Sequence, residues 1–344
     1  MRLLIVTQVV DQHDPILGFF HRWITEYARA CEHVYVLCLR EGTHALPKNV
    51  TVLSLGKEKG HGRLSYLRLF FSYIWKYRHE YDAVFVHMNQ IYVVLGGLLW
   101  RMWGKHIGLW YAHGATSLSL RIATFLTHHV FTSTASGFRL KSRKVRIVGQ
   151  GIDTELFPRC SDSYDVSRVR VVCVGRVGPI KRNEILIDAI AHLRGRGIDA
   201  TATFVGETID RAYLSSLRTQ IAGKHLESAV SFTGAVSPEE VSAYICEADV
   251  FANPSATGSL DKVGLEALVS GVPVVTSNPA FREVLGIYAE RLMFPSDDAE
   301  ALADRITVLH TAPDRRELIE ALSEIVRKKH SVEALIPRIL AHYT

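Results

Sequence analysis

Short apolar runs alternate with longer segments of helical periodicity along the chain. Short runs rich in Val, Ile and Leu are typical of strands buried in a parallel sheet, whereas apolar residues that recur every three or four positions are typical of helices. The strands predicted in the first half are Leu3–Val6, Val34–Leu39, Val50–Leu55, Ala83–His87, Ile107–Tyr111, Val130–Thr132 and Val145–Val148. The helices predicted between them are Phe19–Ala30, Leu64–His79 and Tyr92–Trp103.

The same alternation starts again after the polar stretch Pro158–Arg168, which we interpret as a linker because it is rich in turn-forming residues. The strands predicted beyond it are Val169–Val174, Thr201–Val205, Val230–Phe232, Val250–Ala252 and Val272–Thr276. The helices predicted there are Glu184–Leu193, Tyr213–Ala222, Pro238–Ala248, Gly264–Ser270 and Asp298–Leu309.

This alternation predicts an α/β fold, because strand–helix repeats form parallel sheets that are covered by helices on both faces. We expect two doubly wound, Rossmann-like parallel-sheet domains that face a cleft, formed by residues 1–160 and 161–330. A C-terminal helix at about residues 331–344 is expected to pack back onto the first domain. Ligands of such sheets bind beyond the carboxyl ends of the strands.

Two stretches have features of membrane-directed segments. The apolar residues of Met1–Asp11 are interrupted by Thr7 and Gln8, and no small-residue cleavage site follows, so a first buried strand is the better interpretation. The stretch Ala83–Trp100 has no formal charge and is long enough to span a membrane, but polar residues around His87 lie in its middle. We predict a strand, a loop and a buried helix there, and no transmembrane segment.

The net charge of +5 conceals an uneven distribution. The first 160 residues contain 20 Lys and Arg against 10 Asp and Glu, and the rest contain 20 against 25, so the two parts carry +10 and −5. Between Glu58 and Asp153 only two acidic residues occur. Since 48% of the residues are hydrophobic and 22% are charged, the composition excludes disordered, fibrous and small disulfide-scaffold proteins.

The five cysteines are Cys31, Cys38, Cys160, Cys173 and Cys246. Their number is odd, their spacing is wide, and no pair forms a C-x-x-C motif. We therefore expect reduced and mostly buried thiols, with neither a zinc site nor a disulfide framework.

A first candidate anion site follows the strand Val169–Val174. Gly175 allows a sharp turn, and Arg176 and Lys181 then leave the carboxyl edge of the strand, just before a helix that Asn183 is expected to cap. Two cations beside a helix N-terminus suit a diphosphate. The alternative is an Arg and a Lys in an ordinary solvated turn.

A second candidate site is a Gly- and Ser-containing loop that leads into a helix, where backbone N–H groups can face phosphate. Glu266 lies in the first turns of that helix among apolar neighbours, where it could accept hydrogen bonds from vicinal hydroxyls; the alternative is a partly exposed Glu that the helix dipole favours. The candidate loop residues are Gly258, Ser259, Leu260, Asp261 and Lys262.

The order of these pieces resembles the second domain of retaining family-4, or group 1, glycosyltransferases of the GT-B fold. The matching pieces are G-R-x4-K at 175–181, A-D-V-F-x-x-P-S at 248–255 and L-E-A-x-x-x-G-x-P-V-V at 265–275. Upstream, Gly149–Asp153 with Phe157 resembles the segment of that family near the domain junction.

The resemblance implies that Arg176 and Lys181 bind the donor's diphosphate and that Glu266 binds the nucleotide ribose. The amides of the Gly258–Lys262 loop would hold the sugar or the distal phosphate. Gly258 departs from the family, which usually has a Glu eight residues before the ribose Glu, and Asp261 lies three positions later. Arg182 stands where the family commonly has a Gly after the Lys, and it would add a third cation near the phosphates.

In the first domain, the resemblance implies that Gly18 belongs to a loop close to the donor phosphates. Asp14 and His21 are candidates on the acceptor side, although an Asp-Pro turn before a helix is the alternative for Asp14. His113, just past a predicted strand, matches the family's active-site His and would orient the acceptor or the sugar. We interpret the other notable histidines as structural: His87, His128 and His129.

The resemblance thus implies retaining transfer of a hexosyl-type sugar from a nucleotide-diphosphate sugar to a glycan or lipid-linked glycan, in cell-surface polysaccharide biosynthesis. Arg176, Lys181 and loop amides can stabilise the leaving diphosphate, and no Asp-x-Asp triplet occurs, so we expect no metal and no other cofactor. Two alternatives stay open: a GT-B-fold nucleotide-sugar epimerase, and a non-catalytic protein that binds nucleotide sugars, which is compatible with the departure at Gly258.

The stretch Lys59–His79 contains basic and aromatic residues and no acid. Cations beside exposed aromatic rings suit anionic lipid, so we expect a cytoplasmic protein with peripheral contact between its basic N-terminal half and a membrane. The alternative is that much of the stretch is core, because its aromatic residues do not segregate from the charges at helical spacing. We expect no nucleic-acid partner, since no motif that reads nucleic acid is present.

Overall fold

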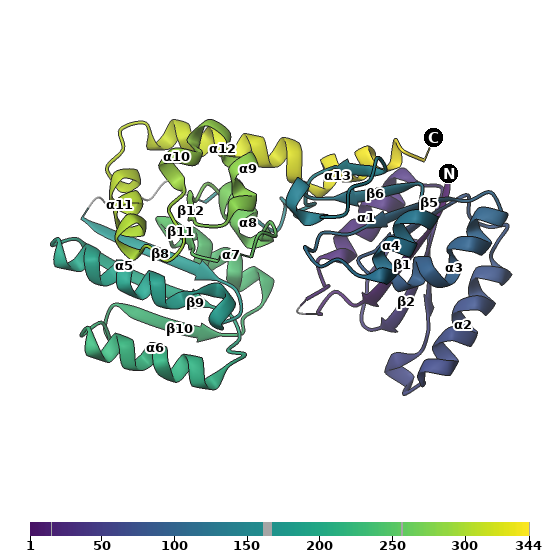
Figure 1. The fold of residues 1–344 in the computed structure, drawn as a ribbon, viewed down its shortest axis with the longest axis horizontal. Coiled ribbons are helices and arrows are strands. Elements are labelled where there is room, and N and C mark those ends of the chain that lie inside the picture. The colour runs from purple at the N-terminus through teal and green to yellow at the C-terminus, as the bar shows by residue number, and fades with distance from the viewer. Residues whose placement is uncertain (15, 161–166, 256, 344) are drawn as a thin grey trace. The chain divides into compact units, whose positions relative to one another are not determined.

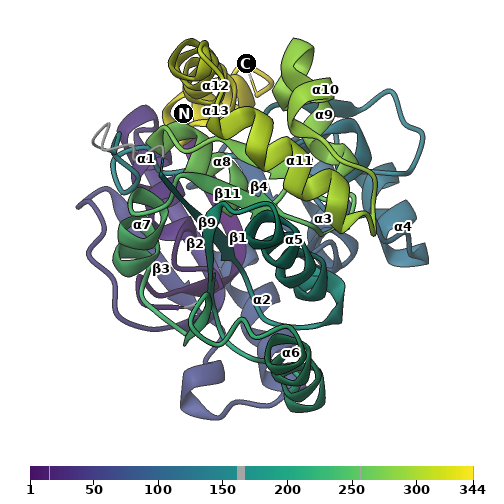
Figure 2. The ribbon, with the colours of Figure 1, turned by 90° about the vertical axis from the view of Figure 1, so that its left-hand side faces the viewer.

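The computed structural model describes residues 1–14, 16–160, 167–255 and 257–343. It separates into two compact units, Met1–Ile152 with Lys329–Thr344, and Asp153–Lys328, which we call the first and the second domain. Figures 1 and 2 show the ribbon from two directions. Residues 161–166 of the predicted linker Pro158–Arg168 lie outside the described residues.

The first domain is built on a seven-stranded sheet in which every pairing is parallel. Its strands are β1 (Arg2–Val10), β2 (His33–Glu41), β3 (Val50–Ser54), β4 (Ala83–His87), β5 (His106–Trp110), β6 (His129–Thr132) and β7 (Val145–Ile147). Their order in space is β3-β2-β1-β4-β5-β6-β7. Parallel neighbours require crossover connections, and helices supply most of them.

Helices cover both faces of this sheet. They are α1 (Phe20–Ala30), α2 (Arg63–Lys76), α3 (Ile91–Met102), α4 (Leu118–Leu126) and α13 (Val332–Leu340). Side chains of α1 and α13 share a core with Leu3 and Ile5 of β1, whereas those of α2, α3 and α4 share a core with Leu4 and Val6. Because alternate residues of a strand point to opposite faces, α2, α3 and α4 lie together on one side of the sheet.

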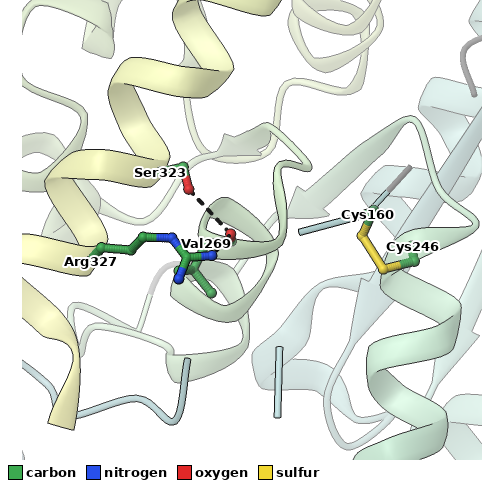
Figure 3. Close-up of a disulfide and its surroundings, with 5 residues drawn as sticks. All are labelled: Cys160, Cys246, Val269, Ser323 and Arg327. Atoms are coloured by element: carbon green, nitrogen blue, oxygen red, sulfur yellow. Dashed lines mark hydrogen bonds between the residues drawn. A yellow bond between two sulfur atoms is a disulfide. The ribbon is translucent and has the colours of Figure 1, made fainter. Parts of the chain in front are cut away.

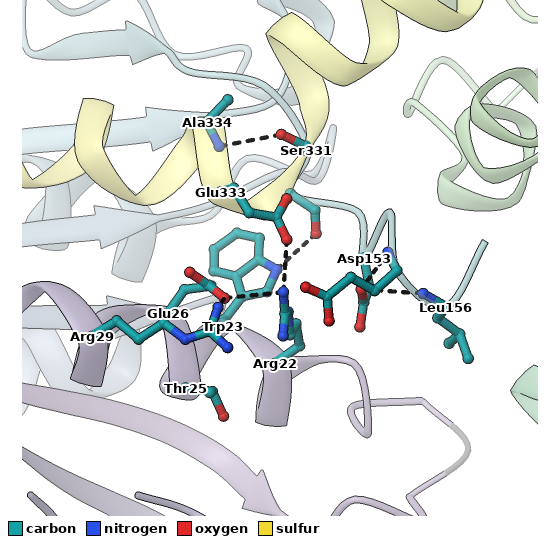
Figure 4. A network of polar contacts seen from close by, with 12 residues as sticks. Arg22, Trp23, Thr25, Glu26, Arg29, Asp153, Leu156, Ser331, Glu333 and Ala334 are labelled. Carbon is teal, nitrogen blue, oxygen red and sulfur yellow. Dashed lines mark hydrogen bonds and ion pairs between the residues drawn. The ribbon is translucent and has the colours of Figure 1, made fainter. Parts of the chain in front are cut away.

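The C-terminal helix α13 is held to α1 by polar contacts within the first domain (Figure 4). The Arg22 guanidinium on α1 pairs with Glu333 on α13 at 2.9 Å and with Glu26 at 3.1 Å. The neighbouring Trp23 donates its indole N–H to the carbonyl of Gly151 at 2.8 Å. The apolar side of α13 adds to the same core through Val332, Leu335, Ile336 and Ile339.

The second domain is built on a five-stranded parallel sheet of order β10-β9-β8-β11-β12. Its strands are β8 (Arg168–Val174), β9 (Asp199–Val205), β10 (Val230–Gly234), β11 (Val250–Asn253) and β12 (Val274–Thr276). The α-helices of this part of the chain are α5 (Asn183–Gly195), α6 (Arg211–Gly223), α7 (Pro238–Cys246), α8 (Lys262–Ser270), α9 (Arg282–Leu285), α10 (Ala289–Leu292), α11 (Ala299–His310) and α12 (Arg315–His330).

All of the predicted strands and helices are present, with ends that differ by a few residues. The pattern missed α4, which is only nine residues long, the four-residue helices α9 and α10, and α12, in which half of the residues are charged. The expected cap of α5 is wrong, because Asn183 is the first helical residue and Arg182, in a left-handed conformation with φ of 51°, precedes it. The Asn183 backbone N–H bonds instead to the Tyr213 hydroxyl at 2.9 Å.

The prediction that all the cysteines are reduced is wrong for two of them. Cys160 and Cys246 form a disulfide within the second domain (Figure 3). These cysteines are 86 positions apart, and the folding of the chain, rather than any local motif, brings them together. The other cysteines, Cys31, Cys38 and Cys173, are free and buried, as expected.

Within the described ranges, we find no helix with both the length and the apolar character needed to cross a bilayer. The uncharged stretch Ala83–Trp100 forms β4, a short loop and most of α3, in agreement with the prediction. However, α3 is not wholly buried, since Leu98 and Met102 are exposed.

Candidate functional site

The strand order of each sheet reverses once, between β1 and β4 in the first domain and between β8 and β11 in the second. Open α/β sheets bind their ligands at such a reversal, beyond the carboxyl ends of the strands. Arg176 and Lys181 follow β8, and Gly258 to Glu266 follow β11, which pairs directly with β8. The sheet therefore brings the two candidate segments of the second domain to the same edge.

Glycine is required where β8 ends. Gly175 has a φ of 143°, and a Cβ added there would lie 3.1 Å from Cε of Lys181. Gly206, after the neighbouring β9, approaches so closely that its Cβ would lie 2.3 Å from the Gly175 carbonyl oxygen. The close turn places the aliphatic part of the Lys181 side chain over the carboxyl end of β8, while Arg176 is exposed.

Asp261 lies at the centre of a polar cluster at this edge. Its Oδ1 accepts a charge-assisted hydrogen bond from Nζ of Lys181 at 2.9 Å. Its Oδ2 accepts from the side-chain amides of Asn253 at 3.0 Å and Asn278 at 3.2 Å. Asn278 also donates to the Ser259 carbonyl at 2.8 Å, so the loop and the Lys181 ammonium are held in fixed positions.

The loop that ends at Asp261 leads from a glycine with a positive φ into the N-terminus of α8. Gly258 has a φ of 71°, a conformation that glycine adopts without strain, and Leu260 is buried. Asp261 is the N-cap residue of α8, but its side chain does not bond to the first N–H groups of the helix. The positive end of the α8 dipole, next to Lys181, therefore suits an anion.

Lys262 and Glu266 lie one helical turn apart on α8, and both side chains are partly buried. Burial raises the pKa of Glu266 to about 7; the Lys262 ammonium opposes this shift and the Asp153 carboxylate adds to it. Burial also holds the pKa of Lys262 well below its ordinary value. Glu266 thus titrates near neutral pH, and its ionised form is purely a hydrogen-bond acceptor through both oxygens.

Arg182, the third cation expected from the sequence, is engaged in polar contacts within the second domain. It bonds to the Ser296 hydroxyl at 3.0 Å and forms an ion pair with Asp297. Arg182 therefore has a carboxylate partner in this structure, as Lys181 has in Asp261. That Arg182 adds a third cation near the phosphates stays a prediction.

In the first domain, the loop after β1 contains the Asp14 and Gly18 candidates. The Asp14 carboxylate accepts the N–H groups of Ile16 and Leu17 at 3.0 and 2.8 Å and forms an ion pair with Arg40. A Cβ on Gly18 would lie 2.6 Å from the Asp14 carbonyl oxygen, so this turn requires glycine. Residue 15, the Pro of the expected Asp-Pro turn, lies outside the described residues.

His21 and His113 lie in different surroundings. His21, on α1, accepts the N–H of Ala45 at 3.2 Å, and burial lowers its pKa. His113 is exposed beyond the carboxyl end of β5, where its Nδ1 accepts the N–H of Ala115 at 3.0 Å. That bond places the proton of the neutral ring on Nε2, so His113 can donate a hydrogen bond to a hydroxyl or a sugar oxygen.

The histidines that we interpreted as structural are engaged locally. His87 is buried and stacks on Phe20 with ring centroids 4.0 Å apart. His128 accepts the N–H of Ile107 at 2.9 Å, and burial lowers its pKa to about 4.

Sequence reasoning missed Asn253 and Asn278, although both contact Asp261. A signal for them existed, because Asn253 ends one strand, β11, and Asn278 lies two residues beyond the end of its neighbour, β12. Asn278 is completely buried and Asn253 nearly so. Buried amides at the carboxyl ends of adjacent parallel strands are expected to meet at a ligand site.

The fold is similar to that of WaaG, a glycosyltransferase involved in lipopolysaccharide biosynthesis, whose structure superposes with a TM-score of 0.68 over 99% of each chain at 14% sequence identity. The structure of HepE (Alr3699) from Anabaena, in complex with UDP, superposes with a TM-score of 0.78 over 99% of each chain, at 20% sequence identity. Together with the two all-parallel, doubly wound sheets, this similarity confirms the predicted GT-B class of fold.

Residues 168–312 match the family described as glycosyl transferases group 1. The matched segment runs from β8 beyond α11 and includes Arg176, Lys181, Asp261 and Glu266. The match confirms the resemblance that the sequence motifs indicated.

Relatives with described activities are similar over part of the chain. A GDP-mannose-dependent α-(1-6)-phosphatidylinositol monomannoside mannosyltransferase of Mycolicibacterium smegmatis is 32% identical over 169 residues, 45% of this chain and 43% of that protein. The putative colanic acid biosynthesis glycosyltransferase WcaL of Salmonella typhimurium is 28% identical over 180 residues, 49% of this chain and 44% of that protein. The chain thus spans less than half the length of these relatives.

Proposed function

We propose that the protein is a retaining, metal-independent glycosyltransferase that moves a hexosyl-type sugar from a nucleoside diphosphate sugar to a glycan or lipid-linked glycan. The observation that carries this proposal is the Lys181 ammonium, held 2.9 Å from Asp261 at the reversal point of the second sheet, within the segment that matches group 1 glycosyltransferases. The named activities of the similar proteins support sugar transfer in surface-glycan or glycolipid synthesis.

The donor chemistry follows from the second domain. Departure of a nucleoside diphosphate builds negative charge on its phosphate oxygens, and Lys181, Arg176 and the N-terminal amides of α8 would stabilise that charge in fixed positions. Glu266, when ionised, would accept hydrogen bonds from the two ribose hydroxyls. These groups supply the electrostatic stabilisation that a metal ion provides in other enzymes, which supports transfer without a metal.

The acceptor chemistry belongs to the first domain in this proposal. His113 would donate from Nε2 and so orient the acceptor or the transferred sugar, with His21 and Asp14 on the acceptor side and Gly18 in the loop near the phosphates. A retaining transfer in which the leaving phosphate assists deprotonation of the acceptor hydroxyl needs orientation from the protein more than a strong base. We place the enzyme in the cytoplasm, at the membrane surface, where lipid-linked acceptors are accessible.

The donor site is tested by titration calorimetry with UDP, GDP and ADP. Lys181→Ala removes a charge-assisted hydrogen bond and should weaken binding of the preferred nucleotide by about tenfold to a hundredfold. Lys328→Ala on α12, a lysine whose side chain is 74% exposed, is the matched control and should bind as tightly as the unaltered protein. Equal affinity of the two variants, or no binding of any of the nucleotides, contradicts the proposed site.

Transfer itself is tested with the preferred nucleotide sugar and a lipid-linked acceptor extract. His113→Ala should keep the donor affinity but lower the transfer rate by about a hundredfold, because orientation is lost. His79→Ala, an exposed histidine after α2, is the control. Transfer at the full rate by the His113 variant removes this residue from the mechanism, and release of an altered sugar without any acceptor indicates an isomerase instead.

A further inference from the structure

The outward sides of α2, α3 and α4 contain an unusual number of exposed apolar side chains. On α2, Phe70 and Ile74 are buried against the sheet, while Leu64, Leu67, Phe71 and Trp75 are exposed. The helix therefore has two apolar lines, one facing the core and one facing solvent. This explains why aromatic and charged residues do not segregate simply along its sequence.

The neighbouring helices repeat the arrangement. On α3 the exposed apolar positions are Ile91, Leu98 and Met102, and on α4 they are Leu118, Ile122 and Phe125. In each helix the positions are three, four or seven residues apart, so they lie along one side. We call the exposed sides of the three helices the apolar face; its side chains are Leu64, Leu67, Phe71, Trp75, Ile91, Leu98, Met102, Leu118, Ile122 and Phe125.

The three helices form one continuous layer. The rings of Trp75 on α2 and Trp103 after α3 meet edge to face, with centroids 5.6 Å apart. Arg101 at the end of α3 donates to the Leu126 carbonyl of α4 at 3.1 Å. Among the described residues of the first domain, only Met1, Ile16 and Ile147 are large exposed hydrophobic residues outside this face, and α1 and α13 on the other side of the sheet expose none.

The charge of this layer has one sign. The helices α2, α3 and α4 contain no Asp or Glu, and their cations are Arg63, Arg68, Lys76, Arg101 and Arg121. Basic side chains also lie beside the exposed rings, since the Arg78 guanidinium is 4.7 Å from the centroid of Trp75 and Nζ of Lys144 is 6.0 Å from that of Phe125. The face therefore combines apolar side chains with positive charge.

We infer that the apolar face docks on the surface of an anionic phospholipid bilayer. Exposed Leu, Phe and Trp side chains can enter the boundary between headgroups and acyl chains, while the cations beside them meet lipid phosphates. Anionic lipid attracts such cations without any partner carboxylate. A second copy of the chain is a poorer occupant, because a two-fold contact would bring two acid-free, positively charged faces together.

The inference stands on the first domain alone and does not require the proposed transferase activity. It deepens that proposal by naming the face that would bring the enzyme to a lipid-linked acceptor.

The test measures co-sedimentation of the full chain with vesicles of phosphatidylglycerol and phosphatidylcholine, and with vesicles of phosphatidylcholine alone. The unaltered protein should bind the anionic vesicles, and binding should fall as salt is raised. The variant Leu64→Ser/Phe125→Ser removes side chains that are 83% and 78% exposed, and should lower the partition coefficient at least tenfold. The matched control Ile287→Ser/Val308→Ser, with side chains 87% and 51% exposed in the second domain, should leave it unchanged.

Charge is tested separately with Arg68→Glu/Lys76→Glu, for which each reversal should lower partitioning at least about fivefold. Arg316→Glu/Lys328→Glu on α12, with side chains 76% and 74% exposed, is its control. Far-UV circular dichroism and nucleotide titration on every variant show that the fold and the second-domain site are intact. A loss of nucleotide binding in the unaltered protein contradicts the proposed function but leaves the vesicle comparison valid.

The inference is overturned if the unaltered protein binds both vesicle types equally or neither, or if test and control variants lose binding equally. It is also overturned if sedimentation velocity shows a dimer that Leu64→Ser/Phe125→Ser converts to monomer without any vesicle binding. In that case the face is an interface between two copies of the chain.

Discussion

Replacing Glu266 by Gln should change the pH dependence of stability in a defined direction. Burial raises the pKa of this carboxyl to about 7, against an ordinary value of 4.5. The folded state therefore prefers the protonated form, so the ionisable Glu266 costs no stability below the unfolded pKa and costs progressively more as the pH rises toward 7. Above the folded pKa the cost is constant.

The magnitude follows from the size of the shift. One pKa unit corresponds to about 1.4 kcal/mol, so the full cost of ionising Glu266 in the folded protein is about 3 kcal/mol. Most of that cost, about 2 kcal/mol, develops between pH 5 and pH 8. Glu266→Gln keeps the shape and removes the ionisation, so its stability relative to the unaltered protein should increase by about 2 kcal/mol over this pH range.

Urea unfolding at pH 5, 6, 7 and 8 measures this difference. All five Trp lie at or before Trp110, so tryptophan fluorescence reports the first domain and far-UV circular dichroism reports both domains. The transition that dichroism detects without a fluorescence change belongs to the second domain. Glu300→Gln, at a carboxylate that is 71% exposed, is the control and should shift stability equally at every pH. A pH-independent difference for Glu266→Gln would refute the reasoning.

Further predictions concern the covalent link, a turn and the polar cluster. Replacing Cys160 and Cys246 by Ser opens a loop of 86 positions and should lower the unfolding free energy of the second domain by about 4 kcal/mol. Before that comparison, thiol labelling of the unaltered protein in denaturant without a reductant should find three reactive thiols. Gly18→Ala forces a Cβ to within 2.6 Å of a main-chain oxygen and should lower the melting temperature of the first domain by several degrees. Gly195→Ala, in α5 where a Cβ meets nothing, should cause no loss of stability. Asn278→Ala removes an amide that holds Asp261, so hydrogen exchange in the loop before α8 should accelerate while exchange in α5 does not change.

Local patterns predicted the sheet elements well, because a buried parallel strand has to be a continuous apolar run and an amphipathic helix has to repeat every three or four residues. They also indicated Arg176 and Lys181 at a strand end. The same patterns could not indicate that Arg182 pairs with Asp297, since that contact joins segments 115 positions apart. Nor could they indicate the disulfide, which depends on where the end of α7 is placed.

The candidate site shows which contacts local sequence patterns cannot predict. Lys181 and Asp261 are 80 positions apart, and only the pairing of β8 with β11 brings them to 2.9 Å. The sequence places Asn253 and Asn278 at the ends of two strands, but only the register of β11 and β12 directs both amides to one carboxylate.

By itself, the sequence determined the order of strands and helices, the division of charge between the two parts of the chain and the motifs that resemble group 1 glycosyltransferases. These properties depend on residues close together along the chain. The tertiary structure decided which side chains meet: Asp261 with Lys181, Cys160 with Cys246, and the exposed apolar lines of α2, α3 and α4 on one face. The physical reason is that such contacts depend on strand order and helix packing, which place residues from distant parts of the chain within a few ångströms of one another.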